Sequence, residues 1–405
     1  MNEMLEPAAV AAAEPTAASF CAFARDEESR RAIEQVAGEL PFGRTMITAG
    51  TIRTAIEYLG AHRSPKVLMV DLSGSELPLT EIDELADVCE PGVTVVAFGE
   101  QNDVGLFREL VARGVGDYLV KPLSPGLVHE SLLRALQGTG AGRRMNRLGR
   151  LVGVLGARGG VGATMIACGT AHAIATSRRR RVCLTDLELQ SGTVALTFDL
   201  DPSHGLREAL ESPERIDSLF VDRAAAKVSE LLHVLAAEEP LDEDCHPHPE
   251  ALSPLLAELR SRFHFVVLDM PRPGSPLFLP CLEQLDELVL VADPSLAAMR
   301  DSLRVLQTLA KCSGACHPTV VLNRIGAYRT GELDPKEFEN GIGRKIDLRI
   351  PFDAKTVAAA LNAGQLSFAE RGPVGQAIGT LARIVSRGPA REPRPLIRRL
   401  LAFWR

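Results

Sequence analysis

The fold of the second half of the chain is decided by the stretch Leu151-Val-Gly-Val-Leu-Gly-Ala-Arg-Gly-Gly-Val-Gly-Ala-Thr164. Its apolar start, Leu151–Leu155, predicts a buried strand, and the glycines after it predict a loop that runs into a helix near Ala163. Glycines let successive backbone N–H groups point inward, and the helix adds the positive end of its dipole. The stretch therefore predicts a phosphate-binding loop formed by Gly159, Gly160, Val161, Gly162 and Ala163.

A hydroxyl and two carboxylates are expected beside this loop. Thr164 lies where a hydroxyl would ligate Mg²⁺ next to the phosphates. The apolar run Phe265–Leu268 is followed by Asp269, and the run Arg181–Thr185 is followed by Asp186. Because the carboxyl ends of parallel strands meet at one edge of a sheet, the pattern predicts a Mg²⁺ site made by Thr164 and Asp269, with Asp186 nearby.

Two more apolar runs complete the second segment. Glu287–Ala292 and Thr319–Leu322 read as buried strands, and Asn323 directly follows the latter. Strands alternating with helical patterns predict a second, larger parallel sheet within residues 151–387.

The first segment, residues 19–137, has the same alternation on a smaller scale. Four short apolar runs predict the strands of a parallel sheet with right-handed crossovers: Phe20–Ala24, Val67–Val70, Thr94–Phe98 and Asp117–Val120. Helical patterns lie between them at Glu28–Glu39, Thr51–Leu59 and Leu106–Arg113. The fold class predicted for the whole chain is thus α/β, with two parallel-sheet domains.

Charged residues follow the strands of the first segment. Asp71 follows the run Val67–Val70, and Lys121 ends the last strand. At the carboxyl edge of the sheet, Asp71 could accept a phosphoryl group and Lys121 could balance its charge. Asp26 lies after the first strand, between Arg25 and Glu27, and is the candidate for an acidic, metal-binding position.

Composition limits the class of protein. The 405 residues carry 45 Lys and Arg against 52 Asp and Glu, a net charge of −7, and 46% of them are hydrophobic. These values are ordinary for folded domains and exclude a collagen, a disulfide scaffold and a disordered chain. The negative charge argues against nucleic acid as a partner of the whole chain. No run reaches the ~18 apolar residues of a membrane span, and no secretory signal is expected.

The eight cysteines indicate a reducing compartment. They are scattered and contain no CxxC pair, so we expect free thiols and a cytoplasmic protein. The clusters Cys245-His246-x-His248 and Cys312-x₃-Cys316-His317 lack a second ligand pair at zinc-finger spacing, and no zinc site is expected.

Three segments lie outside the two domains. Residues 1–18 read as a leader, and residues 138–150 as a basic, glycine-rich linker. Residues 388–405 begin with a Pro-rich stretch and end in an apolar helical face over 396–405 that carries Trp404 beside arginines. Such a helix suits an anionic membrane surface, and the alternative is a helix docked on this protein or on a partner.

The first segment resembles response-regulator receiver domains in the order of Asp71, Lys121 and Pro122. The resemblance implies a phosphate-sensing hydroxyl at the end of the fourth strand, but that position is Gly99. We therefore expect a pseudo-receiver used for docking, and we expect no stable phosphorylation of Asp71.

The glycine loop resembles the deviant Walker A motif, KGGxGK[ST], of the ParA/MinD superfamily of P-loop ATPases. The resemblance implies that Arg158, at the first lysine position, reaches the nucleotide of a dimer partner. The second lysine is Ala163 here, a loss that should weaken ATP binding by ~2–3 kcal/mol and slow hydrolysis. It further implies that Asp186 positions the attacking water or the metal, that Asn323 reads the adenine edge and that Pro351 packs beside the base.

A narrower resemblance is to the CpaE/TadZ branch, whose members help assemble Flp (Tad) pili and position the machinery, often at a pole. It is carried by Asp186–Leu196, Asp199–Pro202, Ala163 and the receiver-like start. It implies an ATP- and Mg²⁺-binding, dimerising assembly factor that docks on pilus machinery proteins, in the cytoplasm or peripherally at the inner membrane or pole.

Two other functions stay open at this point. One is an active ParA/MinD-like ATPase that positions cargo at a membrane or pole, and the other is a receiver-containing regulator. An oxidoreductase is disfavoured because the loop lacks GxGxxG spacing.

Overall fold

The computed structural model describes residues 19–137, 148–201, 203–217, 219–312, 316–328 and 330–386. The predicted leader, most of the linker and the tail helix over 396–405 lie outside these ranges. The chain divides into two compact units between Arg147 and Leu148.

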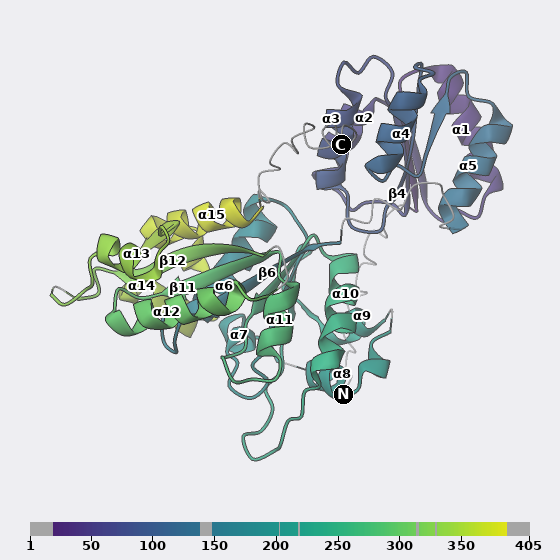
Figure 1. The fold of residues 1–405 in the computed structure, drawn as a ribbon. Helices are drawn as coiled ribbons and strands as arrows, with labels where there is room; N and C mark the ends of the chain where they lie inside the picture. The colour runs from purple at the N-terminus through teal and green to yellow at the C-terminus, as the bar shows by residue number, and fades with distance from the viewer. Residues whose placement is uncertain are drawn as a thin grey trace, which may run out of the picture. The chain divides into compact units, whose positions relative to one another are not determined.

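The first unit alternates strands and helices throughout (Figure 1). Its elements are β1 Phe20–Ala24, α1 Glu27–Glu39, β2 Thr45–Ala49, α2 Ile52–Leu59, β3 Val67–Asp71, α3 Pro78–Val88, β4 Thr94–Gly99, α4 Val104–Ala112, β5 Asp117–Val120 and α5 Pro125–Gln137. The strands are all parallel in the order β2-β1-β3-β4-β5, the flavodoxin-like doubly wound order.

Each face of this sheet is covered by its own helices, because successive side chains of a strand point to opposite faces. Phe23 of β1 joins the core beneath α2, α3 and α4, whereas Phe20 joins the core beneath α1 and α5. The carboxyl ends of β1, β3 and β5 therefore open together at one edge.

The second unit is larger and also alternates strands with helices. Its elements are β6 Arg150–Gly156, α6 Ala163–Ser177, β7 Val182–Asp186, α7 Val194–Thr197, α8 Gly205–Glu211, α9 Phe220–Ala224, β8 Ala226–Lys227, β9 Leu232–Leu235, α10 Leu252–Arg262, β10 Phe265–Asp269, α11 Phe278–Gln284, β11 Glu287–Ala292, α12 Leu296–Leu309, β12 His317–Ile325, α13 Pro335–Ile342, β13 Leu348–Pro351, α14 Ala354–Asn362 and α15 Gly372–Ser386.

The strands of this unit form one sheet in the order β13-β12-β11-β6-β10-β7-β9-β8. The predicted α/β class with two parallel-sheet domains is confirmed, with one exception: the two-residue edge strand β8 pairs antiparallel with β9. β6 lies at the centre between β10 and β11, so the glycine loop at its end lies in the middle of the sheet's carboxyl edge.

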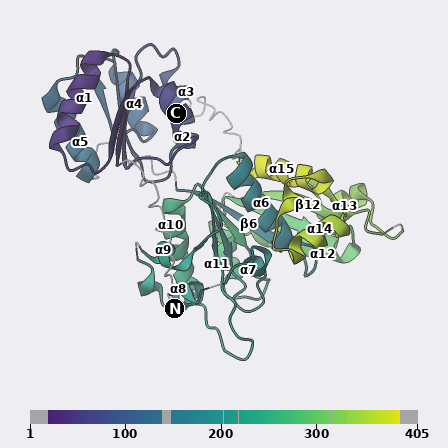
Figure 2. The same cartoon turned by 180° about the vertical axis from the view of Figure 1, so that it is seen from behind.

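Two layers of helices bury this sheet, as the opposite views of Figures 1 and 2 show. Leu151 and Leu155 of β6 pack into the core on the side of α8–α13, whereas Val152 and Val154 pack toward α6, α14 and α15. Burial on both faces explains why these strands read as continuous apolar runs. No helix within the described ranges is both long and apolar enough to cross a membrane.

Candidate functional site

Three charged side chains of the first unit meet at the carboxyl edge of its sheet. Lys121 Nζ lies 2.7 Å from Asp71 Oδ2 and 2.5 Å from Asp26 Oδ2. Asp71 is fully buried and also accepts the backbone N–H groups of Arg25 and Ser73, each at 2.9 Å. Asp26 caps α1 by accepting the Ser29 N–H at 2.7 Å. Every carboxylate oxygen that faces Lys121 is thus already bonded.

The bonds between Lys121 and its carboxylate partners shift the pKa values of Asp26 and Lys121. Burial opposes the charge on Asp26, but the bond to Lys121 outweighs it and lowers the pKa of Asp26 to about 2. Burial likewise works against the Lys121 ammonium, yet its two carboxylate partners raise its pKa. Lys121, Asp26 and Asp71 thus form a cluster in which the ammonium is paired with both carboxylates.

Gly99, at the end of β4, lies close to the Tyr118 side chain. A Cβ there would lie 2.9 Å from the Tyr118 hydroxyl, which itself donates to the Gln101 carbonyl at 2.9 Å. Arg25 lies over the loop after β3, with a guanidinium nitrogen 2.4 Å from where a Cβ of Gly74 would be. Tyr118 and Arg25 thus lie close to the backbone of Gly99 and Gly74.

We expect that acetyl phosphate with Mg²⁺ leaves the full-length protein without a stable aspartyl-phosphate, because Asp71 is buried and fully bonded. Intact-mass spectrometry before and after incubation checks this. A phosphate adduct that disappears in an Asp71→Ala variant would contradict it.

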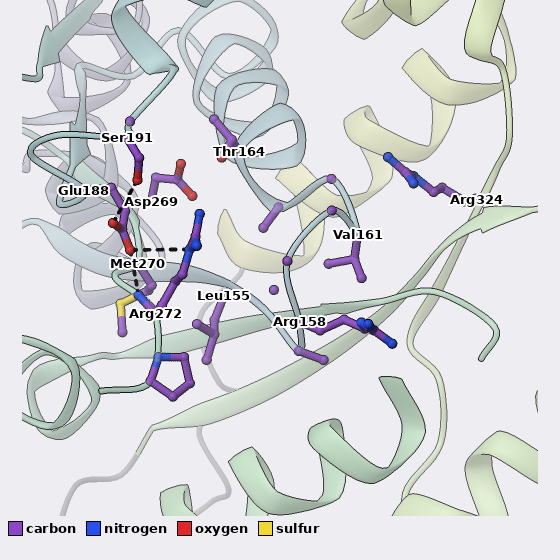
Figure 3. A pocket seen from close by; sticks show the side chains of 18 residues that line it. Leu155, Arg158, Val161, Thr164, Glu188, Ser191, Asp269, Met270, Arg272 and Arg324 are labelled. Atoms are coloured by element: carbon purple, nitrogen blue, oxygen red, sulfur yellow. Dashed lines mark hydrogen bonds and ion pairs between the residues drawn. The ribbon is translucent and has the colours of Figure 1, made fainter. Parts of the chain in front are cut away.

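The second unit places its glycine loop between β6 and α6, at the wall of a cavity of about 470 Å³ (Figure 3). Gly160 and Gly162 have φ angles of 82° and 91°, a left-handed conformation that favours glycine. A Cβ at Gly159 or Gly160 would meet nothing within 4 Å, so the loop faces open space. The amide Nδ2 of Asn323 donates to the Val161 carbonyl at 2.8 Å and supports the loop from behind.

Asp269 and Asp186 lie side by side on β10 and β7, paired in register at the ends of their strands. Burial, reinforced by Asp186, raises the pKa of Asp269 to about 7, against the opposing effect of a hydrogen bond from Thr164. Burial raises the pKa of Asp186 to about 6, although it accepts the N–H groups of Val194 and Glu188, both at 3.1 Å. Two buried acids with raised pKa values are therefore adjacent at the ends of β7 and β10.

The turn after β7 closes over Asp186. A Cβ at Gly192 would lie 2.3 Å from Asp186 Oδ2, so glycine is required for the turn to approach this closely. Asp186 is 1% exposed and is absent from the cavity wall, whereas Asp269 and Thr164 line it. Asp186 therefore holds the turn after β7 through the backbone N–H groups that it accepts, and its role in positioning the attacking water or the metal stays a prediction.

Comparisons with known proteins address this unit. The sequence profile described as "Cellulose biosynthesis protein BcsQ" matches residues 149–309. The septum site-determining protein MinD of Bacillus subtilis is 24% identical over 222 residues, which are 54% of this chain and 81% of that protein. The MinD structure from Pyrococcus horikoshii, in complex with Mg-ADP, is 20% identical, with a TM-score of 0.51 over 59% of this chain and 96% of that one.

The second unit has the ParA/MinD fold. A pilus assembly protein CpaE from Caulobacter crescentus is also similar, with 35% identity, covering 28% of this chain and 88% of that one at a TM-score of 0.27.

Within the ParA/MinD fold, the structure gathers some predicted residues and separates others. Arg158, Thr164, Asp269 and the loop from Gly159 to Ala163 line one cavity. Asn323 and Pro351, predicted to contact the base, do not line it: Asn323 is 3% exposed and bonded to the loop, and Pro351 pairs with Ile325.

Three charged residues of this cavity were missed by the sequence analysis: Glu188, Arg272 and Arg324. Glu188 accepts the Arg272 N–H at 2.9 Å and the Ser191 hydroxyl at 3.4 Å. Arg324 has a left-handed φ of 59°, an uncommon conformation for a residue with a side chain. Arg324 directly follows Asn323, and Arg272 lies three residues after Asp269 at the end of β10. Neither position belongs to a sequence pattern that predicts a binding site.

Proposed function

We propose that this protein is an ATP- and Mg²⁺-binding, dimerising localisation or assembly factor for Flp (Tad) pili, with weak or absent hydrolysis. The observation that carries the nucleotide part is the glycine loop facing the Thr164–Asp269 pair across one cavity. The pilus part rests on the sequence resemblance to the CpaE/TadZ branch.

The residues present suit a Mg²⁺-nucleotide. The open loop offers backbone N–H groups and a helix start to phosphates. A hydroxyl and a carboxylate, Thr164 and Asp269, are the hard oxygen ligands that Mg²⁺ uses alongside water and phosphate. Within the described ranges no group of three or more His, Cys, Asp or Glu is placed to hold a metal ion. The Mg-ADP bound by the Pyrococcus MinD supports the same ligand class.

Weak hydrolysis follows from Ala163. Bound Mg²⁺ would neutralise charge that develops on the phosphates, but the first residue of α6 has no ammonium to share that work. The switch would therefore act through occupancy: nucleotide bound or not bound, with Arg158 reaching toward a second copy. The receiver-like unit, whose acids are closed in ion pairs, would serve as a docking module in the cytoplasm, at the inner membrane or at a pole.

In the organism that encodes this protein, replacing the gene by a Thr164→Ala and Asp269→Asn double variant is expected to abolish surface Flp pili, because both Mg²⁺ ligands are lost. Electron microscopy of cells counts the pili, and an immunoblot confirms equal protein levels. Wild-type pilus numbers at equal protein levels would rule out the proposed role of the site.

A further inference from the structure

The missing lysine leaves a charge deficit in the cavity, and arginines are the available replacements. Three of them line it: Arg158, Arg272 and Arg324. A nucleoside triphosphate brings four negative charges at most, and Asp269 and Glu188 lie in the same wall. Positive charge on the Asp269 side of the cavity, from a protein side chain as well as from a bound Mg²⁺, would offset this excess.

Arg272 is on that side of the cavity. It follows the end of β10 between Pro271 and Pro273, whose rings fix their own φ angles and restrict the backbone around the arginine. In Figure 3 its side chain rises from the strand end beside Glu188 and ends on the side where Asp269 lies. Its backbone N–H is held by Glu188 Oε1 at 2.9 Å, so the base of the side chain is anchored.

The guanidinium itself is only loosely engaged. Its Nε lies 4.0 Å from Glu188 Oε1, which is too far for a hydrogen bond, and the arginine side chain is 76% exposed. An exposed pair of this kind contributes little stability. The planar fork of N–H donors thus stays available for a phosphate, which arginine binds in a bidentate way.

The other two arginines are placed differently. Arg158 leaves the outer side of the loop and points away from Asp269, and Arg324 approaches from the end of β12 across the loop (Figure 3). Neither lies on the Asp269 side of the cavity.

We propose that Arg272 supplies to the terminal phosphate of bound Mg-ATP the positive charge that Ala163 cannot supply, with Glu188 as its positioning residue. This inference rests on the proposed nucleotide binding. It makes the cavity selective for triphosphate over diphosphate, since the diphosphate lacks the group that Arg272 contacts.

Calorimetric titration of the full-length protein tests it with both Mg-ATP and Mg-ADP. Arg272→Ala is expected to weaken Mg-ATP binding roughly tenfold to hundredfold, and Mg-ADP binding less than threefold, as for a lost charged hydrogen bond. Arg272→Lys should keep most of the affinity. Arg300→Ala, an exposed arginine of α12 outside the cavity, is the matched control and should bind as the wild type does.

The possible failures are distinguishable. If the wild type binds neither nucleotide, the proposed function fails. If the wild type binds Mg-ATP and Arg272→Ala binds it equally well, or loses Mg-ADP affinity to the same extent, the role of Arg272 is wrong. Rescue of the Arg272→Ala variant by Ala163→Lys would support it, because a merely structural arginine would not be replaced by a lysine on α6.

Discussion

Asp269→Asn is expected to stabilise the nucleotide-free second unit at pH 8 by on the order of 3 kcal/mol, because it removes a buried charge. Burial and Asp186 raise the pKa of Asp269 to about 7 in the folded protein, against 3.8 for the free side chain. Between about pH 4 and pH 7, Asp269 therefore keeps its proton in the folded state and has released it in the unfolded state. The free energy of unfolding therefore falls as pH rises from about 4 to 7 and then levels off.

Urea denaturation in Mg²⁺-free buffer at pH 5 and pH 8 measures this effect. The wild type should be less stable at pH 8 than at pH 5, and Asp269→Asn should reduce that difference. Asp242→Asn, an exposed acid outside the site, is the control and should leave it unchanged. If Asp269→Asn kept the wild-type pH dependence of the unfolding free energy, the raised pKa of Asp269 would be contradicted.

Ala163→Lys is expected to tighten Mg-ATP binding roughly thirtyfold, about 2 kcal/mol, by restoring a charged hydrogen bond to the phosphates. Ala163 is the first residue of α6 and lines the cavity, so a longer side chain there can enter it. The gain should be larger in an Arg272→Ala background, where no other cation serves the terminal phosphate. Hydrolysis should rise more than binding, since the added charge also stabilises the transition state.

Titration calorimetry gives the affinity, and single-turnover assays give the rate. Ala163→Met, of similar length without the charge, separates packing from electrostatics. If lysine and methionine change the affinity equally, the missing charge is not what limits this site.

The glycine loop and the two aspartate-ending strands could be predicted because each is a local pattern with a strong physical cause. β6 and β10 are buried on both faces, so their sequences are continuous apolar runs, and the loop glycines have positive φ angles. Two strands near the sheet edges, β2 and β9, were missed for the opposite reason. β2 is half exposed, and β9 carries His233 among its apolar residues, so neither reads as a buried strand.

Strand position does not determine side-chain direction, on which the roles predicted for Asn323 and Asp186 depend. Asn323 follows its strand as predicted, but its amide bonds to the loop carbonyl of Val161. Asp186 reaches the predicted edge, yet the turn through Gly192 closes over it. Arg272 lines the cavity, and its backbone N–H donates to Glu188, 84 residues away in the sequence. Such partners lie far apart in the sequence and meet only in the folded protein, so local sequence patterns do not reveal them.

Calorimetric titration of Mg-ATP into the full-length protein tests most directly whether a glycine loop without its lysine still binds nucleotide. We expect a dissociation constant in the micromolar range, and no measurable binding in a Thr164→Ala and Asp269→Ala double variant, because both Mg²⁺ ligands are then absent. The absence of binding by the wild type up to millimolar Mg-ATP would contradict the account and leave the ParA/MinD fold of this protein as a scaffold for docking.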